Sequence, residues 1–213
     1  MANELNLSIE WRSRRFADAA TGLRAFAEHM NKNFGDVPGA ISVELRGFLE
    51  DVSEALSDRH SKPWPGGTGP KTLSKRSGFM LEAIRESITV DGATIPSIEG
   101  RIAIPGKRKI HENGGVLRPK KSKYLTIPLP AALDSRGIPL KPKARDWKNT
   151  FVIRSKAGNL LIVRRKGAGI EPLYLLKTEV YIPPRLGMRE TIEAGSTMLA
   201  DRLSDAILKQ LRK

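Results

Sequence analysis

Apolar side chains recur every three or four positions along two stretches near the N-terminus, Ile9–Phe34 and Gly39–Arg59. This spacing puts them on one face of a helix, so it predicts an amphipathic helix over each stretch. The apolar positions are Trp11, Phe16, Ala19, Ala20, Leu23, Phe26, Ala27 and Met30 in the first stretch, and Ile41, Leu45, Phe48, Leu49, Val52, Ala55 and Leu56 in the second. Because Gly35 and Pro38 separate the stretches, we expect an antiparallel pair of helices joined by a short turn.

The same period returns twice further along the chain. It predicts a third helix from Lys71 to Ser87 and a last helix from Gly187 to Lys213. The segment Ser61–Gly69, SKPWPGGTG, contains two prolines and three glycines and cannot continue a helix. The side chain of Trp64 in this segment either covers the core or is exposed and contacts a partner.

Between the third and last helices the pattern changes to short apolar runs separated by turn residues. The predicted strands are Ser87–Val90, Thr94–Ile95, Ile98–Ile104, Tyr124–Leu129, Thr150–Arg154, Leu160–Arg164 and Leu173–Ile182. Asp91-Gly92 and Ala157-Gly158-Asn159 are typical of hairpin turns, so the strands should pair antiparallel. The segment Ala132–Lys148 has little periodicity, and we expect it to form an exposed excursion between strands.

This order of elements predicts an α+β fold with N-terminal helices, a central antiparallel sheet with long loops, and a C-terminal helix packed on the sheet. A chain of 213 residues suits one large domain or two small ones. We expect a helical pair over residues 1–60, a Pro/Gly-rich connector over 61–70 and an α+β domain over 71–213. No apolar run approaches the roughly 20 residues of a membrane span, and the N-terminal sequence does not resemble a secretory signal.

Positive charge is concentrated in the middle of the chain. The formal net charge is +14, and residues 101–166 alone contain 18 Lys and Arg against three acidic residues, a net of +15. Such a local field attracts nucleic acid or an acidic protein surface. Three clusters carry half of these cations: Lys107, Arg108 and Lys109; Lys120, Lys121 and Lys123; and Arg164, Arg165 and Lys166. They lack the interleaved aromatic residues that stack bases, so we expect them to contact phosphates without sequence readout, or else acidic neighbouring subunits.

The sequence contains few of the residues from which catalytic sites are usually built. It has no cysteine and only three histidines, and neither His29 nor His60 has a partner at the spacing of metal ligands. His111 and Glu112 are adjacent, so on an extended backbone they would point to opposite faces. The sequence GGTGPKT from Gly66 lacks the spacing of a phosphate-binding loop. We therefore expect no enzymatic activity, no cofactor and no metal ion.

Four motifs follow one another in the C-terminal two-thirds of the chain. They are Leu73–Leu81 (LSKRSGFML) leading to Ser87-Ile88, Ile110–Gly115 (IHENGG), Lys123–Pro128 (KYLTIP) and Ile182–Arg185 (IPPR). In their order these motifs resemble the virion-morphogenesis and tail-completion family of tailed bacteriophages, which includes neck and minor tail proteins. The N-terminal helices and the segment Ala132–Lys148 are additional to the smaller members of that family.

The resemblance implies a small α+β subunit that forms a ring, commonly sixfold, at the head-to-tail joint of the virion, after assembly in the bacterial cytoplasm. Its partners would be further copies of this chain, the tail terminator or tail tube, and the head-completion or connector proteins, with genome DNA in the lumen and no membrane. Trp64 and Arg185 would serve in packing or in a contact between subunits. The alternative is a nucleic-acid-binding protein without sequence specificity that acts outside a particle.

Overall fold

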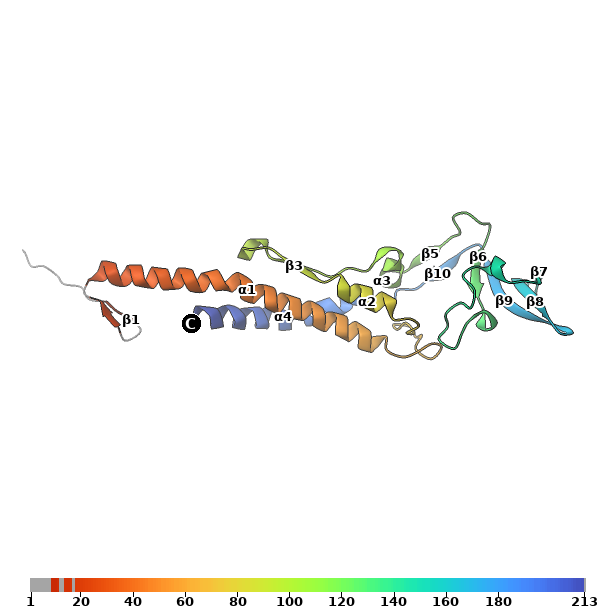
Figure 1. Ribbon diagram of the computed structural model, residues 1–213, viewed down its shortest axis with the longest axis horizontal. Helices are drawn as coiled ribbons and strands as arrows, with labels where there is room; N and C mark the ends of the chain where they lie inside the picture. Colours follow the sequence, from red (N-terminus) through yellow and green to blue (C-terminus); the bar gives the residue numbers. More distant parts are fainter. Residues whose placement is uncertain (1–8, 12–13, 17, 213) are drawn as a thin grey trace, which may run out of the picture. The chain divides into compact units, whose positions relative to one another are not determined.

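The computed structural model describes residues 9–11, 14–16 and 18–212. The predictions for residues 1–8, and parts of the helix predicted from Ile9, lie outside the described residues. Figure 1 shows long helices near both ends of the chain and antiparallel strands between them, which confirms the predicted α+β class.

Contacts group the chain into two compact units. Unit 1 combines Met1–Glu50, Ile88–Arg101 and Ala194–Lys213, and unit 2 combines Asp51–Ser87 and Ile102–Glu193. Each unit is thus assembled from separated segments, whereas the divisions at residues 60 and 70 expected from the sequence follow the chain. The candidate site described below lies entirely within unit 2.

The first described elements of unit 1 are strands β1 (Ile9–Trp11) and β2 (Arg14–Phe16), which pair antiparallel. The predicted start of a helix at Ile9 is therefore wrong, and α1 begins at Ala19. Asp18 sets this start, because its carboxylate accepts hydrogen bonds from the backbone N–H and the hydroxyl of Thr21, both at 2.8 Å. An aspartate in this position satisfies an N–H group that the first helical turn leaves without a partner.

Helix α1 runs without interruption from Ala19 to Arg59, so the predicted antiparallel pair of helices is wrong. Pro38 lies inside the helix, where a proline costs ~3 kcal/mol because it removes one backbone hydrogen bond and crowds the preceding turn. Val37 beside it is only 1% exposed, and burial of such a side chain contributes about 1.5–3 kcal/mol. Packing at Val37 therefore offsets the break that the sequence predicts at Pro38.

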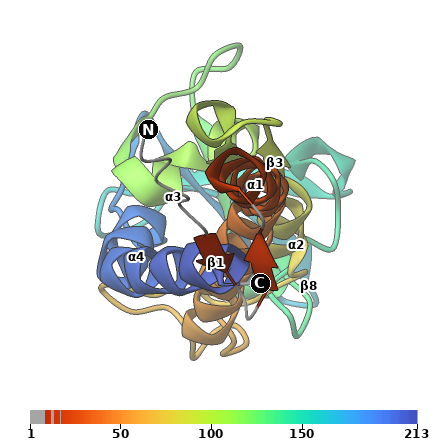
Figure 2. The same ribbon diagram turned by 90° about the vertical axis from the view of Figure 1, so that its left-hand side faces the viewer.

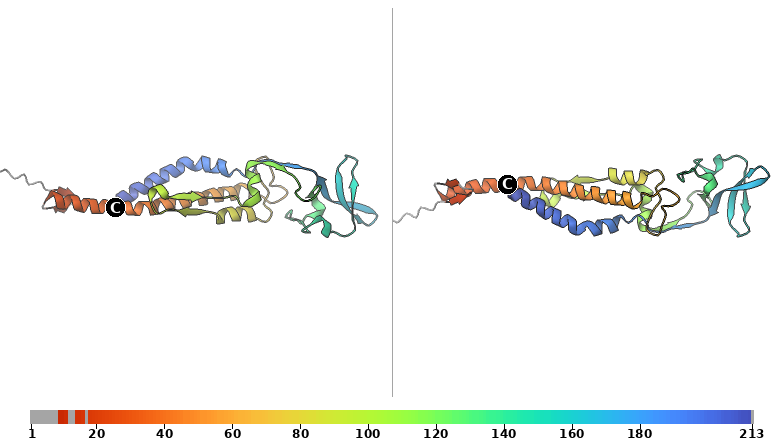
Figure 3. Two further views of the ribbon diagram at one scale, coloured as in Figure 1. Left: turned by 90° about the horizontal axis from the view of Figure 1, so that it is seen from above. Right: turned by 90° about the horizontal axis from the view of Figure 1, so that it is seen from below.

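The C-terminal helix α4 (Met188–Leu211) confirms the predicted last helix. In unit 1 it packs against α1 at Gly195, where any side chain would collide with the ring of Phe48. The guanidinium of Arg202 forms an ion pair with Glu44 at 2.9 Å. Figures 2 and 3 show these parts of the two helices side by side. In this unit the partner of α4 is therefore α1, a contact that the prediction of a helix packed on the sheet did not include.

The predicted hairpin after the third helix forms in unit 1, but its connection is longer than a two-residue turn. β3 (Thr89–Asp91) pairs antiparallel with β4 (Glu99–Arg101). The predicted strand Thr94–Ile95 is wrong, because Ile95–Ser97 forms a 3-10 turn. The hydroxyl of Ser97 accepts a hydrogen bond from the N–H of Thr94 at 3.0 Å, which closes this turn.

Unit 2 contains a four-stranded antiparallel sheet in the order β6-β9-β8-β7. Its strands are β6 (Leu125–Pro128), β7 (Thr150–Arg154), β8 (Leu160–Lys166) and β9 (Gly169–Lys177). The predicted turn Ala157–Asn159 joins β7 to β8 and is confirmed by the hydrogen bond from the N–H of Ser155 to the carbonyl of Asn159. The side chains of Val163 and Leu173 in this sheet are fully buried.

The segment Ala132–Lys148 is anchored on this sheet near both ends, although most of its residues are exposed as predicted. Ala132 is fully buried against Leu173 and Tyr174. At the other end of the segment, the indole N–H of Trp147 donates to the hydroxyl of Tyr174 at 3.1 Å. Two anchors far apart in the segment hold it in place, and neither produces a periodic pattern in the sequence.

Helix α2 (Phe79–Glu86) is shorter than the predicted helix from Lys71 to Ser87. The N–H groups before it bind elsewhere: that of Leu73 donates to the imidazole of His60 at 3.1 Å, and that of Lys75 donates to the carbonyl of Lys62 at 2.9 Å. The first half of the predicted helix is therefore wrong, since these groups cannot also form helical hydrogen bonds.

Candidate functional site

The segments around His111 and Arg185 lie side by side in unit 2, although they are far apart in the sequence. The strands β5 (Gly115–Leu117) and β10 (Val180–Ile182) pair antiparallel. Next to them, the carbonyl of His111 accepts hydrogen bonds from the N–H groups of Arg185 and Leu186 at 2.7 and 2.8 Å. The IHENGG and IPPR motifs thus form one structural feature. We call it the junction, and it comprises Ile110–Gly115 and Ile182–Met188.

His111 and Glu112 lie in a short helical turn, α3 (Ile110–Asn113), so the predicted extended backbone at this position is wrong. The two carboxylate oxygens of Glu112 accept hydrogen bonds from the N–H groups of Met188 and Arg189, both at 2.9 Å. These are the first residues of α4, and a negative charge there satisfies unpaired N–H groups and favours the helix dipole. Glu112 is therefore committed to starting the last helix.

Gly114 allows the two halves of the junction to approach each other. Its φ is +68°, in the left-handed region that side chains disfavour. A Cβ atom at this position would lie 2.8 Å from Cδ of Pro184 and 3.2 Å from the carbonyl oxygen of Ile182. The glycine of the IHENGG motif is thus required by the close contact with the IPPR motif.

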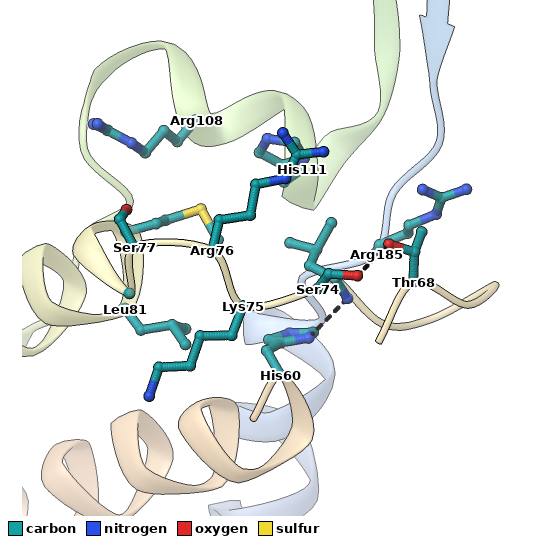
Figure 4. A pocket seen from close by; sticks show the side chains of 13 residues that line it. His60, Thr68, Ser74, Lys75, Arg76, Ser77, Leu81, Arg108, His111 and Arg185 are labelled. Atoms are coloured by element: carbon teal, nitrogen blue, oxygen red, sulfur yellow. Dashed lines mark hydrogen bonds between the residues drawn. The ribbon is translucent and has the colours of Figure 1, made fainter. Parts of the chain in front are cut away.

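A cavity of about 480 Å³ lies beside the junction in unit 2 (Figure 4). Its wall is formed by the end of α1, the connector, the residues up to and within α2, and the junction. The positively charged or titratable side chains that line it are Lys75, Arg76, Arg108, Arg185, His60 and His111. No aspartate or glutamate is among its lining residues. The cavity therefore has a positive lining without a counter-charge.

Two of the arginines in this wall are held in place by aromatic rings. The guanidinium of Arg108 lies 4.7 Å from the centre of the Phe79 ring, and that of Arg76 lies 5.7 Å from the Trp64 ring. Arg76 also donates from Nη1 to the carbonyl of Gly137 at 2.6 Å. Because a guanidinium carries five N–H donors, these contacts position each side chain and leave donors for a further partner.

His111 and Arg185 contribute polar atoms that have no partner. Nδ1 of His111 and Nε of Arg185 are shielded from solvent and form no hydrogen bond. Burial, followed by the positive charges of Arg185 and Arg108, lowers the pKa of His111 below its ordinary value. Leaving a buried polar atom unsatisfied costs about 1–3 kcal/mol. The inner wall of the cavity is thus an environment that an anion would stabilise.

His60, in contrast, is fully used by the fold. It is 2% exposed and accepts the hydrogen bond from Leu73 on Nδ1. Nε2 therefore carries the proton and donates to the carbonyl of Leu186 at 3.0 Å. Burial is the main cause that lowers the pKa of His60. This histidine connects α1 with the segments around residues 73 and 186, and neither of its nitrogens is available to a ligand.

The first predicted basic cluster is divided by the fold. Lys107, Arg108 and Lys109 lie in a 3-10 turn, Gly106–Lys109, before α3. Arg108 is half-buried and lines the cavity, whereas Lys107 and Lys109 are exposed. Only the two lysines therefore remain on the outer surface.

The second cluster is on the surface as a whole. Lys120, Lys121 and Lys123 are exposed in the loop that joins β5 to β6. The ammonium group of Lys123 lies 5.6 Å from the centre of the Tyr124 ring. No ion pair links these three lysines to an acid among the described residues. This loop is the largest uncompensated group of cations among the three predicted clusters.

The third cluster is largely neutralised within the sheet. Both carboxylate oxygens of Glu171 on β9 are occupied, one by Nε of Arg164 at 2.7 Å and the other by Nζ of Lys166 at 2.8 Å. These hydrogen bonds lower the pKa of Glu171. Arg165 is exposed and lies 5.7 Å from the centre of the Phe151 ring. Two of the three cations predicted as one contact patch thus share one carboxylate, and Arg165 is left without one among the described ion pairs.

Trp64 packs within unit 2, which favours the first of its two sequence interpretations. The side chain is half-buried, and a Cβ atom at Gly137 would lie 2.6 Å from its ring. Arg76 covers the ring and binds the carbonyl of the same glycine. The indole therefore fixes the position of one arginine of the cavity wall.

Three residues that shape these sites are absent from the predicted set: Arg76, Glu112 and Glu171. Arg76 lies in the LSKRSGFML motif, directly before the segment that opens α2. Glu171 faces Arg164 across the β8–β9 pair, and if the strand predicted from Leu173 had been extended by two residues at its N-terminal end, the two residues would have been placed together. Glu112 has no local signal, because its partner Met188 is 76 residues away in the sequence.

Across residues 9–11, 14–16 and 18–212, no group of three or more His, Asp or Glu side chains is arranged to hold a metal ion. In the same part of the chain, none of the helices combines the length and the apolar character that a membrane span requires. Comparison with models of protein families, with curated proteins and with solved structures finds no match.

Proposed function

We propose that this protein is a structural, non-enzymatic subunit of a tailed-phage virion, which completes or caps the tail and joins it to the head. The observation that carries the proposal is the junction. Two of the motifs that resemble the tail-completion family fold onto each other there, through the carbonyl of His111 and the carboxylate of Glu112. The polar groups of these motifs support the backbone, as a rigid assembly subunit requires.

The sheet of unit 2 offers a surface for such assembly. Phe151 and Ile170 are exposed on one face of it, and Arg165 lies over the Phe151 ring. Surfaces that combine aromatic residues with arginine are enriched at protein interfaces. A closed ring needs two different complementary surfaces on each subunit, and this sheet surface is suited to be one of them.

The partners in this proposal are further copies of the chain in a ring, expected to be sixfold, the tail terminator or tail tube, and the head-completion or connector proteins. The exposed loop with Lys120, Lys121 and Lys123 would contact DNA in the lumen or an acidic neighbour. Lysines of this kind bind phosphates through charge alone and do not read sequence. Such contacts suit a channel through which DNA of any sequence passes.

The test is assembly of the full chain with purified tail tubes, followed by light scattering and electron microscopy. We expect rings at the tube end, and we expect the double substitution Phe151→Ser and Ile170→Ser to abolish them without unfolding the protein. The control is Val43→Ser, which changes an exposed apolar residue on α1 and should leave assembly unchanged. A chain that stays monomeric with and without tail tubes would overturn the proposal.

The second candidate is a nucleic-acid-binding protein that acts outside a particle, and the exposed cations of the 120–123 loop favour it. In that case the monomer binds duplex DNA, and the logarithm of the binding constant falls linearly with the logarithm of salt concentration. Replacing Lys120, Lys121 and Lys123 by serine would then reduce this slope. Monomeric binding at physiological salt, combined with no effect of tail tubes, would establish this alternative over the first.

A further inference from the structure

The cavity beside the junction is lined by several cations and, like the surface of the 120–123 loop, lacks an acid. Lys75, Arg76, Arg108 and Arg185 line it, and none of the four forms an ion pair with a described residue. Their positively charged side chains line the same cavity. Bringing such cations together without an anion is unfavourable, because like charges repel and burial removes part of their hydration.

Elsewhere in unit 2, some arginines are neutralised by nearby carboxylates, whereas others, such as Arg154 and Arg165, form no ion pair with a described residue. Arg59 binds Glu190 at 3.2 Å, and Arg118 binds Glu179 at 2.8 Å. The cavity brings several such cations together with no acid in its lining, so a bound anion would supply a counter-charge that the protein does not.

We propose that this cavity binds a phosphate-bearing ligand no larger than a nucleoside monophosphate, with the phosphate group held by Arg76, Arg108 and Arg185. Phosphate is a dianion near neutral pH, and it matches several cations better than a single carboxylate does. Guanidinium groups bind its oxygens in pairs, with a planar geometry that also fixes orientation.

The size and lining of the cavity support a ligand with a part beyond the phosphate. Its volume of about 480 Å³ lies within the roughly 300–1,000 Å³ of small-molecule sites. Leu73, Met80 and Leu81 supply an apolar portion of the wall. A nucleoside-sized group can occupy this portion while its phosphate faces the arginines.

The unpartnered atoms of the junction are consistent with this assignment. Nε of Arg185 and Nδ1 of His111 have no hydrogen-bond partner, and a bound oxyanion would supply acceptors within the same wall once the Arg185 side chain turns toward it. A nearby anion would also favour the protonated form of His111, whose present neighbours include the cations Arg185 and Arg108. Ligand binding should therefore change the NMR signal of the His111 ring.

The experiment uses the full chain and calorimetric titration with inorganic phosphate, with adenosine monophosphate and with acetate. We expect saturable binding of the two phosphate compounds and no saturable binding of acetate. Arg185→Gln and Arg108→Gln should each weaken phosphate binding at least about tenfold, in line with the ~1.5–3 kcal/mol of a hydrogen bond to a charged group. The matched control is Arg145→Gln, an exposed arginine of unit 2 outside the cavity, which should change the affinity less than about twofold.

Two further measurements test the site independently of the Arg185 variant. If Arg185→Gln does not fold, Arg108→Gln still tests the site, because that side chain contacts only the Phe79 ring within the described hydrogen bonds and ring contacts. Binding of short duplex DNA with and without a 5′-phosphate then identifies the source of the phosphate group. If the phosphorylated duplex binds more tightly and Arg108→Gln removes this preference, the site binds strand ends. If both duplexes bind equally, the site binds a free phosphate compound. The proposal is overturned if phosphate does not saturate a site, or if both cavity variants bind as tightly as the control. This outcome is independent of ring assembly, which uses other surfaces.

Discussion

The cavity wall and the cluster Arg164–Lys166 contain similar numbers of cations but treat their charge differently. In the cluster, Glu171 receives Arg164 and Lys166 at 2.7 and 2.8 Å. In the cavity, three arginines and one lysine line the wall without an acid. A run of basic residues in a sequence is therefore not a measure of free positive charge. What matters is whether the fold brings a carboxylate to the same place.

The two regions also differ in how rigidly the backbone is held. The cavity wall includes the junction, in which Gly114 fits closely against Pro184. The cluster lies at a hairpin turn in which a Cβ atom at Gly167 would meet nothing within 4 Å. Both glycines have a positive φ, +68° and +60°. Gly114 also has a ψ of 176°, a combination essentially restricted to glycine, so the two glycines offer a pair of substitutions that share a positive φ and differ in their surroundings.

The largest predicted effect is that of Gly114→Ala on stability. The left-handed backbone costs an alanine about 1–2 kcal/mol, and the collision with Pro184 adds a packing strain of similar size. We expect the free energy of unfolding to fall by about 3 kcal/mol in denaturant titration. Gly167→Ala, which lacks the collision, should reduce it by only about 1 kcal/mol.

Equal losses for the two alanine variants would contradict the close fit of the junction. The cavity would then have a wall as adaptable as a hairpin turn, and its arginines would not be fixed by the backbone. A larger loss for Gly114→Ala, accompanied by weaker phosphate binding, would instead connect the rigidity of the junction to the site that it supports.

The strands and the last helix could largely be predicted from the sequence, because their signals are local. The turn at Gly158 and the strand Thr150–Arg154 are found as predicted. The continuity of α1 could not be predicted, since Pro38 is a local signal for a break and the burial of Val37 is a property of the tertiary structure.

The cavity was even less accessible to prediction. Its cations come from three separated segments, represented by Arg76, Arg108 and Arg185, and only the fold shows that no acid lies among them. Arg108 and Arg185 are in the predicted set of contact residues, but for other roles. The neutralisation of Arg164 by Glu171 follows from strand register, and the predicted start of the following strand at Leu173 left Glu171 outside that strand. A sequence shows which side chains are charged, whereas only the strand register and the tertiary packing show which cations have an acid beside them.

The second prediction concerns pH and separates the two regions by the groups that titrate. His111 and His60, both at the cavity, have pKa values lowered chiefly by burial. Between pH 6.5 and these lowered values, the unfolded chain binds protons that the folded chain does not. Stability from this source is therefore complete above about pH 6.5 and is lost as the pH falls toward 5. Urea unfolding at several pH values and NMR titration of both rings measure it.

Constant or rising stability on acidification from pH 7.5 to 5.5 would contradict this prediction. The carboxylate of the cluster should not contribute in this range, because its hydrogen bonds to Lys166 and Arg164 lower the pKa of Glu171 from an ordinary value already below pH 5. The ion pairs of Glu171 stabilise the fold fully when the pH is above the ordinary pKa of a glutamate. This stabilisation is lost only as the pH falls through the lowered pKa of Glu171 in the folded chain. A decline in the free energy of unfolding between pH 7.5 and 5.5 is thus caused by the histidines at the cavity. The contribution of the cluster should decrease only at lower pH.

The smallest predicted effect is that of Glu171→Gln on the affinity for polyanions. The substitution releases Arg164 and Lys166 from their shared carboxylate, and each additional phosphate contact raises the salt dependence of binding by about 0.9 in slope. We expect duplex DNA to bind about two- to fivefold more tightly at low salt, with a slope steeper by at most about 1.8. The control is Asp201→Asn, which changes the net charge equally at an exposed position on α4. If both variants bind DNA alike, net charge alone governs the interaction, and local compensation by Glu171 has no functional weight. If only Glu171→Gln gains affinity, the native chain keeps this cluster neutralised and leaves contact with polyanions to the cations that lack an acid.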